Sequence, residues 1–405
     1  MPRRAHTVTA TPSATRSVPT TPTGPPEHHT IGLPGWLPWR EVIVPWAASR
    51  LVALVTIIVA GAVHDDSPTA SWLRSWDGSW YTSIAANGYG DPPVHGQQSA
   101  WPFFPLLPGV IRGFDALGID ALGLDGADGA LMVNELAFLL ALAGVWRIAS
   151  TCCSTRGARI AVWAMAVFPL SFVHSMLYPS AIFFAASTWA FAFAMERHDV
   201  HAGASAVLAT AVRPNGIVVA AILATAALLA VGATGRAVAG ADHADELATR
   251  VRRAVVLAAP SGLAFAGWML WVRDRTGDSL AFWHAKSAWD EITIVEFLRM
   301  QREHLRVGAD LPHVIVGGTA LLLVALVVVR LPLDWLALVA LTVVPAAIVG
   351  VVGLGRYAGE CFPVGVAAGM LGERLPRTVP PLLLVASTGA MVWIASLVVV
   401  ARYVP

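Results

Sequence analysis

Long apolar segments constrain this chain more than any other feature of its sequence. They recur from Glu41 to Val404 with polar interruptions, and several approach the roughly 20 residues that a helix needs to span a bilayer core. Charged residues make up 13% of the 405 residues, whereas a soluble domain carries about 25%. These features exclude a soluble enzyme and predict an all-α, polytopic membrane protein.

We expect about 11 membrane-spanning segments in a membrane domain that covers residues 36–405. Their predicted ranges are 41–63, 130–149, 159–176, 179–195, 201–212, 216–233, 254–272, 313–330, 334–352, 358–372 and 379–402. Residues 1–35 are rich in Pro, Thr and Ser and lack the apolar core of a signal peptide, which predicts a disordered cytoplasmic tail. The break at Arg213–Gly216 predicts two half-helices, whose free backbone groups must be buried in protein or face water.

The arginines predict the orientation of this domain. Cytoplasmic loops of membrane proteins are enriched in basic residues, and the short loops on one side hold Arg147, Arg156, Arg159, Arg197, Arg250, Arg252, Arg253, Arg330, Arg374 and Arg377. Two long loops, 64–129 and 273–312, then face the outside and carry most of the acidic residues. Lys286 is the only lysine, a bias typical of GC-rich bacterial genomes. We therefore expect a bacterial cell membrane protein with its active site outside.

Several function classes are excluded or disfavoured by composition. A net charge of +1 and the lack of a Lys/Arg-rich run exclude a large nucleic-acid surface. Three cysteines cannot assemble a disulfide framework or a zinc ligand set. No Walker loop, GxGxxG or HExxH motif occurs. We therefore expect no metal, no cofactor and no nucleotide-driven transport.

Two segments depart from a plain helical pattern. Arg50 lies near the middle of the first predicted span, where an unpaired charge costs about 3 kcal/mol, so we expect a partner for it, with Glu135 one candidate. The apolar segment Trp101–Pro108 has a proline at every third position, which predicts irregular backbone rather than a helix.

The segment Trp76-Asp77-Gly78-Ser79-Trp80-Tyr81 places one carboxylate among aromatic rings, shortly after the first span ends. Partial burial raises the pKa of a carboxylate and suits it to general-base catalysis. The same pattern also fits a loop Asp that turns onto Gly78, with the tryptophans as interface anchors. On the residues alone, both interpretations of Asp77 stand equally.

Basic residues beside predicted helix starts indicate an anionic ligand. Arg213 and Asn215 precede a half-helix, and free N–H groups at a helix start favour a phosphate beside a guanidinium. Arg356-Tyr357 repeats this arrangement before a later span. A proline kink with an interface arginine is the alternative for Arg213. A lipid-linked phosphate fits both sites.

Further candidates lie in the second long loop and at one turn. Lys286 occurs in the segment Phe282–Trp289, where His284 and Trp289 are also candidates to contact a phosphate or stack on a sugar. A solvated lysine with core aromatics is an equal alternative. Tyr178 lies at a short turn between two spans, where a tyrosine is more often an interface residue.

The chain resembles the PIG-V-type mannosyltransferases in an ordered set of motifs. These are Arg50, Trp76-Asp77-Gly78 with Trp80-Tyr81, Ile84-Ala85, Gly88-Tyr89, Phe103-Phe104-Pro105-Leu106 with Pro108, Tyr178 before Phe183-Phe184, Arg213-Pro214-Asn215-Gly216, Leu280–Trp289, and Arg356-Tyr357 with Phe362-Pro363. Two positions depart from the family pattern: Pro179-Ser180 follow Tyr178 where a Glu is common, and Gln97-Gln98 replace an acidic residue.

The resemblance implies a GT-C-type helical bundle and a glycosyltransferase, specifically a mannosyltransferase. Such an enzyme takes a sugar from a polyprenyl-phosphate donor, usually the mannose one, and gives it to a lipid-glycan or cell-envelope acceptor with inversion. Asp77 is then the candidate base, and Arg213, Arg356 and Lys286 are candidates for the donor phosphate. The expected substrate-binding residues are Trp76, Trp80, Tyr81, Tyr178, Asn215, His284, Trp289 and Tyr357.

Two other function classes compete with this interpretation. A secondary transporter or lipid flippase also uses broken helices and buried arginines, but it should contain related halves, and the sequence has a single Trp-Asp-Gly segment. A noncatalytic assembly subunit is favoured if the two acidic residues that this chain lacks are essential in the family.

Overall fold

The computed structural model describes residues 38–64, 69–235, 243–289, 293–302 and 311–399, so the predicted tail 1–35 lies outside the described residues. Within these ranges every regular element is a helix, which confirms the all-α prediction. Four helices are long and apolar enough to cross a membrane, and six more apolar helices have 10–17 residues.

Each predicted span overlaps a helix, but the predicted span 159–176 continues past the end of its helix at Ala166, and the span 358–372 includes the break between two helices at 360–361. The longer helices are α1 (Trp39–His64), α5 (Gly126–Ala149), α6 (Thr155–Ala166), α7 (Ser180–Met195), α8 (Asp199–Val212), α9 (Gly216–Leu229), α10 (His243–Thr276), α13 (Leu311–Leu326), α14 (Leu333–Val349), α16 (Phe362–Gly372) and α17 (Val379–Val399). The predicted half-helices are α8 and α9, of 14 residues each. At 1.5 Å per residue each is about 21 Å long, which is shorter than the bilayer core.

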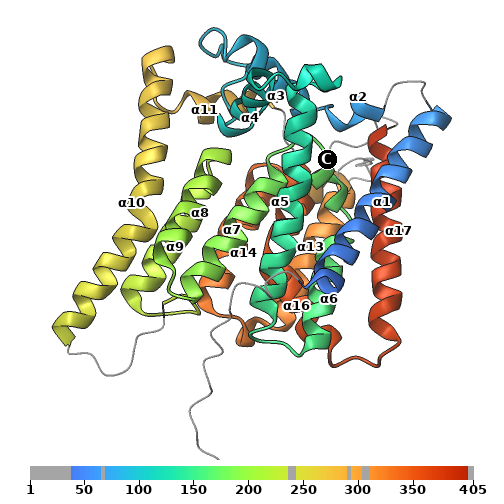
Figure 1. Cartoon of the computed structure of the whole chain (residues 1–405), viewed down its shortest axis with the longest axis vertical. Coiled ribbons are helices and arrows are strands. Elements are labelled where there is room, and N and C mark those ends of the chain that lie inside the picture. Colours follow the sequence, from blue (N-terminus) through green and yellow to red (C-terminus); the bar gives the residue numbers. More distant parts are fainter. Residues whose placement is uncertain (1–37, 65–68, 236–242, 290–292, 303–310, 400–405) are drawn as a thin grey trace, which may run out of the picture. The chain divides into compact units, whose positions relative to one another are not determined.

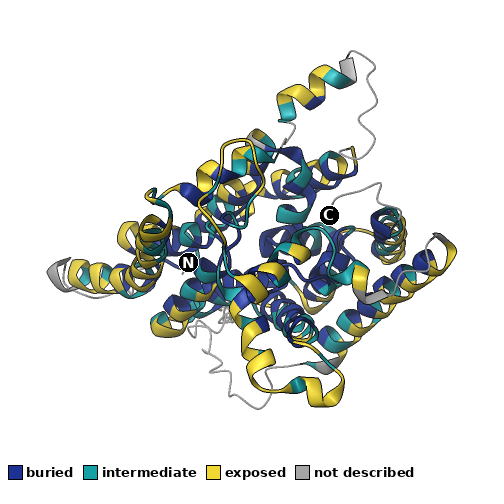
Figure 2. Cartoon of the chain, turned by 90° about the horizontal axis from the view of Figure 1, so that it is seen from above, coloured by how far each residue is buried: buried dark blue, intermediate teal, exposed yellow. Residues whose placement is uncertain are grey.

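Helix α7 packs against α5 and α8, and α1 packs against α17 at another side of the bundle (Figure 1). Small residues let the backbones approach: a Cβ on Gly203 of α8 would lie 2.5 Å from the Val256 carbonyl of α10, and one on Gly369 of α16 would lie 2.5 Å from the Gly157 carbonyl of α6. Seen along the helices, buried residues face the inside of the bundle and exposed ones its perimeter (Figure 2). This pattern fits helices whose outer faces meet lipid.

The two long loops meet at one end of the helices, which we call the site end (Figure 1). The first loop contains α2 (Thr69–Leu73), α3 (Asp77–Asn87), α4 (Leu106–Ala116) and η2 (Ile119–Leu122); the second contains α11 (Ala281–His284), η4 (Ala285–Ala288) and α12 (Ile294–Arg302). Phe104 contacts Phe282 with ring centroids 5.7 Å apart. Side chains from the two loops therefore build one surface.

The prediction that Trp101–Pro108 is irregular is wrong at its end. Helix α4 begins at Leu106, and Pro108 lies in its first turn. A proline is tolerated there because the first N–H groups of a helix have no carbonyl partner within it.

Arg50 is buried, and its close partners are a backbone carbonyl, hydroxyl groups and an aromatic ring. It donates to the Ser171 carbonyl (2.8 Å), the Ser171 hydroxyl (3.1 Å) and the Ser175 hydroxyl (3.0 Å). Its guanidinium lies 4.3 Å from the Phe138 ring centroid. Glu135, the predicted partner, attracts it at longer range. Arg50 thus ties α1 to η3 (Ser171–Ser175).

Candidate active site

Asp77 is the first residue of α3, and a strained residue places it there. Trp76 has φ 56° and ψ −122°, which is rare for a residue with a side chain. The Asp77 N–H donates to the Tyr178 hydroxyl at 3.2 Å, and the Leu177 N–H donates to the Leu73 carbonyl at 2.7 Å. The strained turn is therefore held against the turn that precedes α7.

Asn134 fixes that second turn from α5. Its buried side-chain NH₂ donates to the carbonyls of Met176 (2.7 Å) and Tyr178 (2.9 Å). The Tyr178 side chain is fully buried, and burial, with the nearby Asp77 charge, raises the pKa of its hydroxyl. Tyr178 therefore stays neutral, and its hydroxyl oxygen accepts the hydrogen bond from the Asp77 N–H.

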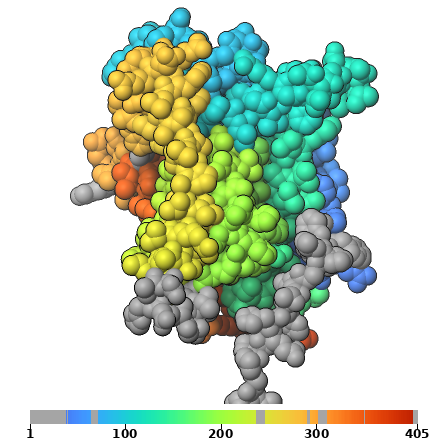
Figure 3. Space-filling view, turned by 60° about the vertical axis from the view of Figure 1, so that its left-hand side comes forward, coloured from blue at the N-terminus to red at the C-terminus, as the bar shows by residue number. Residues whose placement is uncertain are grey.

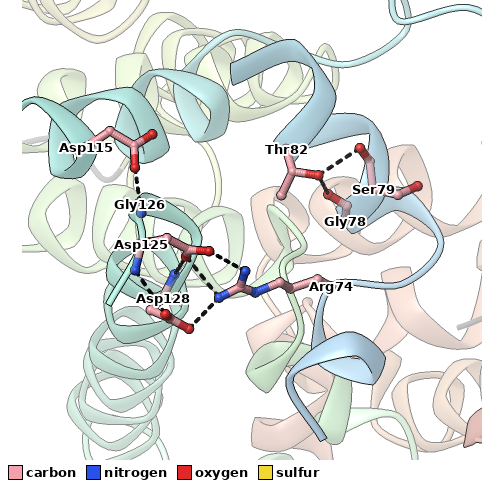
Figure 4. Close-up of polar contacts among 8 residues, drawn as sticks. All are labelled: Arg74, Gly78, Ser79, Thr82, Asp115, Asp125, Gly126 and Asp128. Carbon is pink, nitrogen blue, oxygen red and sulfur yellow. Dashed lines mark hydrogen bonds and ion pairs between the residues drawn. The ribbon is translucent and has the colours of Figure 1, made fainter. Parts of the chain in front are cut away.

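Arg74, which precedes α3, ties this segment to the start of α5 (Figure 4). Arg74 contacts the carboxylates of Asp125 (2.6 Å) and Asp128 (2.5 Å). Asp125 caps α5 and forms a capping box with Asp128, and the Asp115 carboxylate accepts the Gly126 N–H at 2.7 Å. Partial burial disfavours the charge on Asp125, but the hydrogen bonds and charge of Arg74, together with backbone N–H groups at the start of α5, outweigh this and keep the pKa of Asp125 below its usual value.

The Asp77 carboxylate forms an ion pair across 279 positions of sequence. Its Oδ2 lies 3.3 Å from Nη1 of Arg356, in the short helix α15 (Leu354–Gly359). The Asp77 side chain is 32% exposed, whereas that of Arg356 is 12% exposed. Burial opposes the charge on Arg356, but the Asp77 carboxylate, together with the neighbouring tyrosines and Glu360, outweighs it, so the pKa of Arg356 is raised. The carboxylate is the accessible member of the pair.

Arg213 lies beside this pair but is tied elsewhere. It contacts Oε2 of Glu360 at 2.5 Å and the Ser180 hydroxyl at 2.8 Å, and the Glu360 side chain is completely buried. The Tyr357 ring lies 5.4 Å from the Arg213 guanidinium and 5.5 Å from that of Arg356. The two arginines thus flank one tyrosine, and two carboxylates balance their charge.

Aromatic side chains from both long loops form a wall close to Asp77. The Trp80 ring stacks on Phe103 at 5.6 Å and meets Trp289 edge-on at 5.6 Å. Tyr81 is buried and lies edge-on to Phe103 at 5.2 Å; burial and the Asp77 charge raise the pKa of its hydroxyl. Trp80 is only partly buried, so this wall includes an accessible ring one helical turn beyond Asp77.

The structure brings most of the predicted site residues together. Asp77, Trp80, Tyr81, Tyr178, Arg213, Trp289, Arg356 and Tyr357 form the connected cluster described above. His284 instead pairs with Asp278 at 2.6 Å on an exposed part of the second loop. Lys286 lies on η4, two residues beyond His284, and Asn215 directly precedes α9 without a side-chain capping hydrogen bond.

Three contributing residues were not predicted. Glu360, Ser180 and Asn134 hold Arg213 or the Tyr178 turn, as described above. Glu360 is a charged residue in an otherwise apolar stretch, which was a usable signal because such residues seldom lack a partner. Ser180 and Asn134 offered none.

The cluster has the parts of an acid–base site that also binds an anion. Asp77 is a partly exposed carboxylate that can accept a hydrogen bond from an incoming hydroxyl, and the neighbouring guanidinium of Arg356 can contact a phosphate. No group of three or more His, Cys, Asp or Glu side chains within the described residues is placed to hold a metal ion. The side chains of this cluster can carry out proton transfer and charge stabilisation.

Fold and site together define a polytopic helical membrane protein with a charged, partly accessible cluster at one end of its helices. No family model matches the sequence, and no curated protein matches it. Among solved structures, the chain is similar to the oligosaccharyltransferase of Archaeoglobus fulgidus in the apo form, with a TM-score of 0.45 and 13% identity over 90% of this chain. It covers 56% of that protein, little more than half of its length.

The chain is also similar to ArnT from Cupriavidus metallidurans bound to undecaprenyl phosphate. The TM-score is 0.45 and the identity 16%, over 90% of this chain and 72% of that chain. At this level of similarity, the function has to be inferred from the residues of the site.

Proposed function

We propose that this protein is a GT-C-type membrane glycosyltransferase. It transfers a sugar, mannose in our proposal, from a polyprenyl-phosphate donor to a lipid-glycan or cell-envelope acceptor outside the cell membrane. The observation that carries the proposal is the pairing of the accessible Asp77 carboxylate with the buried Arg356 guanidinium, 3.3 Å apart. The motif resemblance around Trp76-Asp77-Gly78 supports the same activity.

In the proposed reaction Asp77 is the general base. Its carboxylate accepts the proton of the acceptor hydroxyl while that oxygen attacks the anomeric carbon of the donor sugar. The bond from this carbon to the phosphate oxygen breaks, and the bonding electrons leave with the polyprenyl phosphate. Attack opposite the leaving group inverts the anomeric configuration. A positioned base of this kind contributes about 10² to 10⁴ in rate.

Arg356 supplies charge stabilisation during this step. One negative charge disappears from Asp77 as it is protonated, and one additional negative charge appears on the departing phosphate. A guanidinium has five N–H donors, so Arg356 can remain bonded to Asp77 and contact the phosphate as well. Such donors stabilise the transition state because the charge moves toward groups that are already oriented.

Arg213 has a different role from Arg356 in the proposed reaction. Glu360 and Ser180 hold its guanidinium with one hydrogen bond each, so it contributes a fixed positive charge beside Tyr357 more than a free ligand. The accessible ring of Trp80, with Trp289 behind it, supplies an apolar face for the sugar. Aromatic faces suit such contacts because they are large, rigid and slightly negative.

The experiment is a transfer assay with purified full-length protein, polyprenyl-phosphate mannose and a membrane lipid extract, followed by mass spectrometry of the products. We expect a mannosylated lipid or glycan. Asp77→Asn keeps the shape of the side chain but cannot take the proton, so turnover should fall by about 10² to 10⁴. Asp120→Asn, an exposed carboxylate in the same loop, is the matched control and should keep its activity.

Transport of lipid without any product, in protein-containing vesicles, would favour the transporter or flippase class. Retained turnover in Asp77→Asn would instead move the base to another carboxylate. A folded Asp77→Asn variant that still binds donor separates a lost proton acceptor from a collapsed site.

A further inference from the structure

A cavity separate from the Asp77 cluster lies toward the end of α3 opposite Asp77. It has a volume of about 840 Å³ and is enclosed by the segment Asn87–Pro92, by α4, and by the site end of α10. Figure 3 shows the face of the molecule where the site end of α10 meets the first loop. On α3 the lining starts at Ile84, about 10 Å along the helix axis from Asp77, and no residue of the Asp77 cluster lines the cavity. It is therefore a separate site.

One wall of the cavity consists of four aromatic rings. Trp268 stacks on Trp271 at 4.9 Å, and Tyr89 contacts Trp101, Trp268 and Trp271 at 5.3–5.4 Å. The Trp101 N–H donates to the Asp91 carbonyl, and the Tyr89 hydroxyl donates to the Phe103 carbonyl. These bonds and contacts fix the rings before any ligand arrives.

Polar and charged residues also line the cavity, beside prolines, glycines and Ile84. They include Asn87, Asp91, Arg112 and Arg275. Arg112 donates to the carbonyls of Ala85 (2.6 Å) and Ile84 (3.1 Å), which holds its guanidinium at the end of α3. The Arg275 guanidinium lies 5.7 Å from the Trp271 ring centroid. Donors and acceptors thus surround the aromatic wall.

Glycines keep the space between these groups open. Gly88, Gly90, Gly109 and Gly267 belong to the lining, and a Cβ added to any of them would meet no atom within 4 Å. Gly88 and Gly90 have φ of 80° and 70°, a conformation that glycine adopts readily. Gly109 and Gly267 lie on helices, where any residue fits the backbone. Larger side chains at these two positions would occupy the cavity.

We propose that this cavity binds a carbohydrate, the sugar portion of the acceptor distant from the reacting hydroxyl. Its volume lies within the range of ligand pockets, about 300–1,000 Å³. A sugar ring presents an apolar C–H face, which suits the fixed aromatic wall, and hydroxyls at its edge, which suit the polar lining. An acyl chain would cover the exposed Asn87 and Asp91 side chains without offering them hydrogen bonds, which disfavours it.

Carbohydrate binding itself does not depend on the proposed activity, whereas the assignment to the acceptor rests on it. The test is saturation-transfer NMR on detergent-solubilised full-length protein with a panel of neutral trisaccharides: mannotriose, maltotriose, cellotriose and chitotriose. Glycerol 3-phosphate, a lipid headgroup analogue, is added in a separate arm. We expect at least one trisaccharide to bind.

Gly267→Leu and Gly109→Leu fill the cavity and should weaken that binding at least tenfold. Gly262→Leu is the matched control, because Gly262 lies on the same helix with open space beside it but outside the lining; it should bind as the wild type does. No binding by any trisaccharide, or equal binding by all three variants, would overturn the proposal. Binding of glycerol 3-phosphate alone would overturn it in favour of a lipid headgroup.

The variant Asp77→Asn distinguishes an incorrect carbohydrate-site proposal from an incorrect proposal about the transferase activity. Trisaccharide binding should be unchanged in that variant, since the cavity lies at the other end of α3. Binding without turnover in the wild-type protein would leave the carbohydrate site standing and remove the transferase. Loss of trisaccharide binding in folded Asp77→Asn would mean that the ligand occupies the Asp77 site, which would overturn the separate cavity site.

Discussion

Removing one partner of the buried ion pair between Arg213 and Glu360 should destabilise the fold more than removing one partner of an exposed pair. Their side chains are 9% and 0% exposed, with Nη1 and Oε2 2.5 Å apart. At an effective dielectric constant of about 20, two charges about 4 Å apart attract by about 4 kcal/mol. Removing one partner leaves the other charge buried and uncompensated, which costs about 3–5 kcal/mol. Glu360→Gln should therefore lower the free energy of unfolding by about this amount.

The assay is unfolding in mixed micelles with increasing sodium dodecyl sulfate, followed by tryptophan fluorescence. Glu41→Gln is the matched control: Glu41 pairs with Arg159 at 3.0 Å, but the Arg159 side chain is 56% exposed. Such a pair contributes about 0–1 kcal/mol, so this control should unfold almost as the wild type does.

A double variant completes the experiment. Arg213→Met with Glu360→Gln removes both charges, and replacing both members of a buried pair is often neutral. The double variant should therefore lose less stability than the sum of the two single variants. If Glu360→Gln costs no more than Glu41→Gln, or if the single effects add, the reasoning about this pair is wrong.

Three further predictions concern the donor, the orientation and pH. Arg356→Ala should weaken donor binding about tenfold or more, since a charge-assisted hydrogen bond contributes about 1.5–3 kcal/mol; an unchanged donor titration would exclude it. A cysteine at the exposed His95 should react with an impermeant reagent in intact cells, and labelling only after permeabilisation would reverse the topology. Asp125→Asn keeps the helix cap but loses the charge that Arg74 contacts. Since the pKa of Asp125 is lowered in the fold, its charge stabilises the fold above the usual Asp pKa of about 3.9. The difference in unfolding free energy between wild type and variant should therefore disappear as pH falls through the lowered pKa. A difference that persists in acid would contradict this.

The helices were predictable because lipid leaves the backbone few alternatives. Each N–H and C=O within a bilayer core must be bonded inside the structure, so an apolar segment of sufficient length has to be helical. The break at Arg213–Gly216 was predictable for a related reason, since Pro and Gly end a helix locally. Both properties depend on residues close together in the chain. Where the local rule was applied too strictly, at Pro108, the helix begins only just before it, at Leu106, so the proline lies in the first turn and is tolerated.

The contacts of the site were decided by the tertiary structure. Asp77 meets Arg356 across 279 positions, and Arg213 meets Glu360 across 147. No periodicity connects such residues; their helices bring them together by packing. The sequence identified Asp77 and the two arginines as charges that require partners near a membrane, because unpaired charges there are costly. Which carboxylate pairs with which arginine, and so which one remains accessible to a hydroxyl, follows only from how α3, α8 and α15 lie against one another.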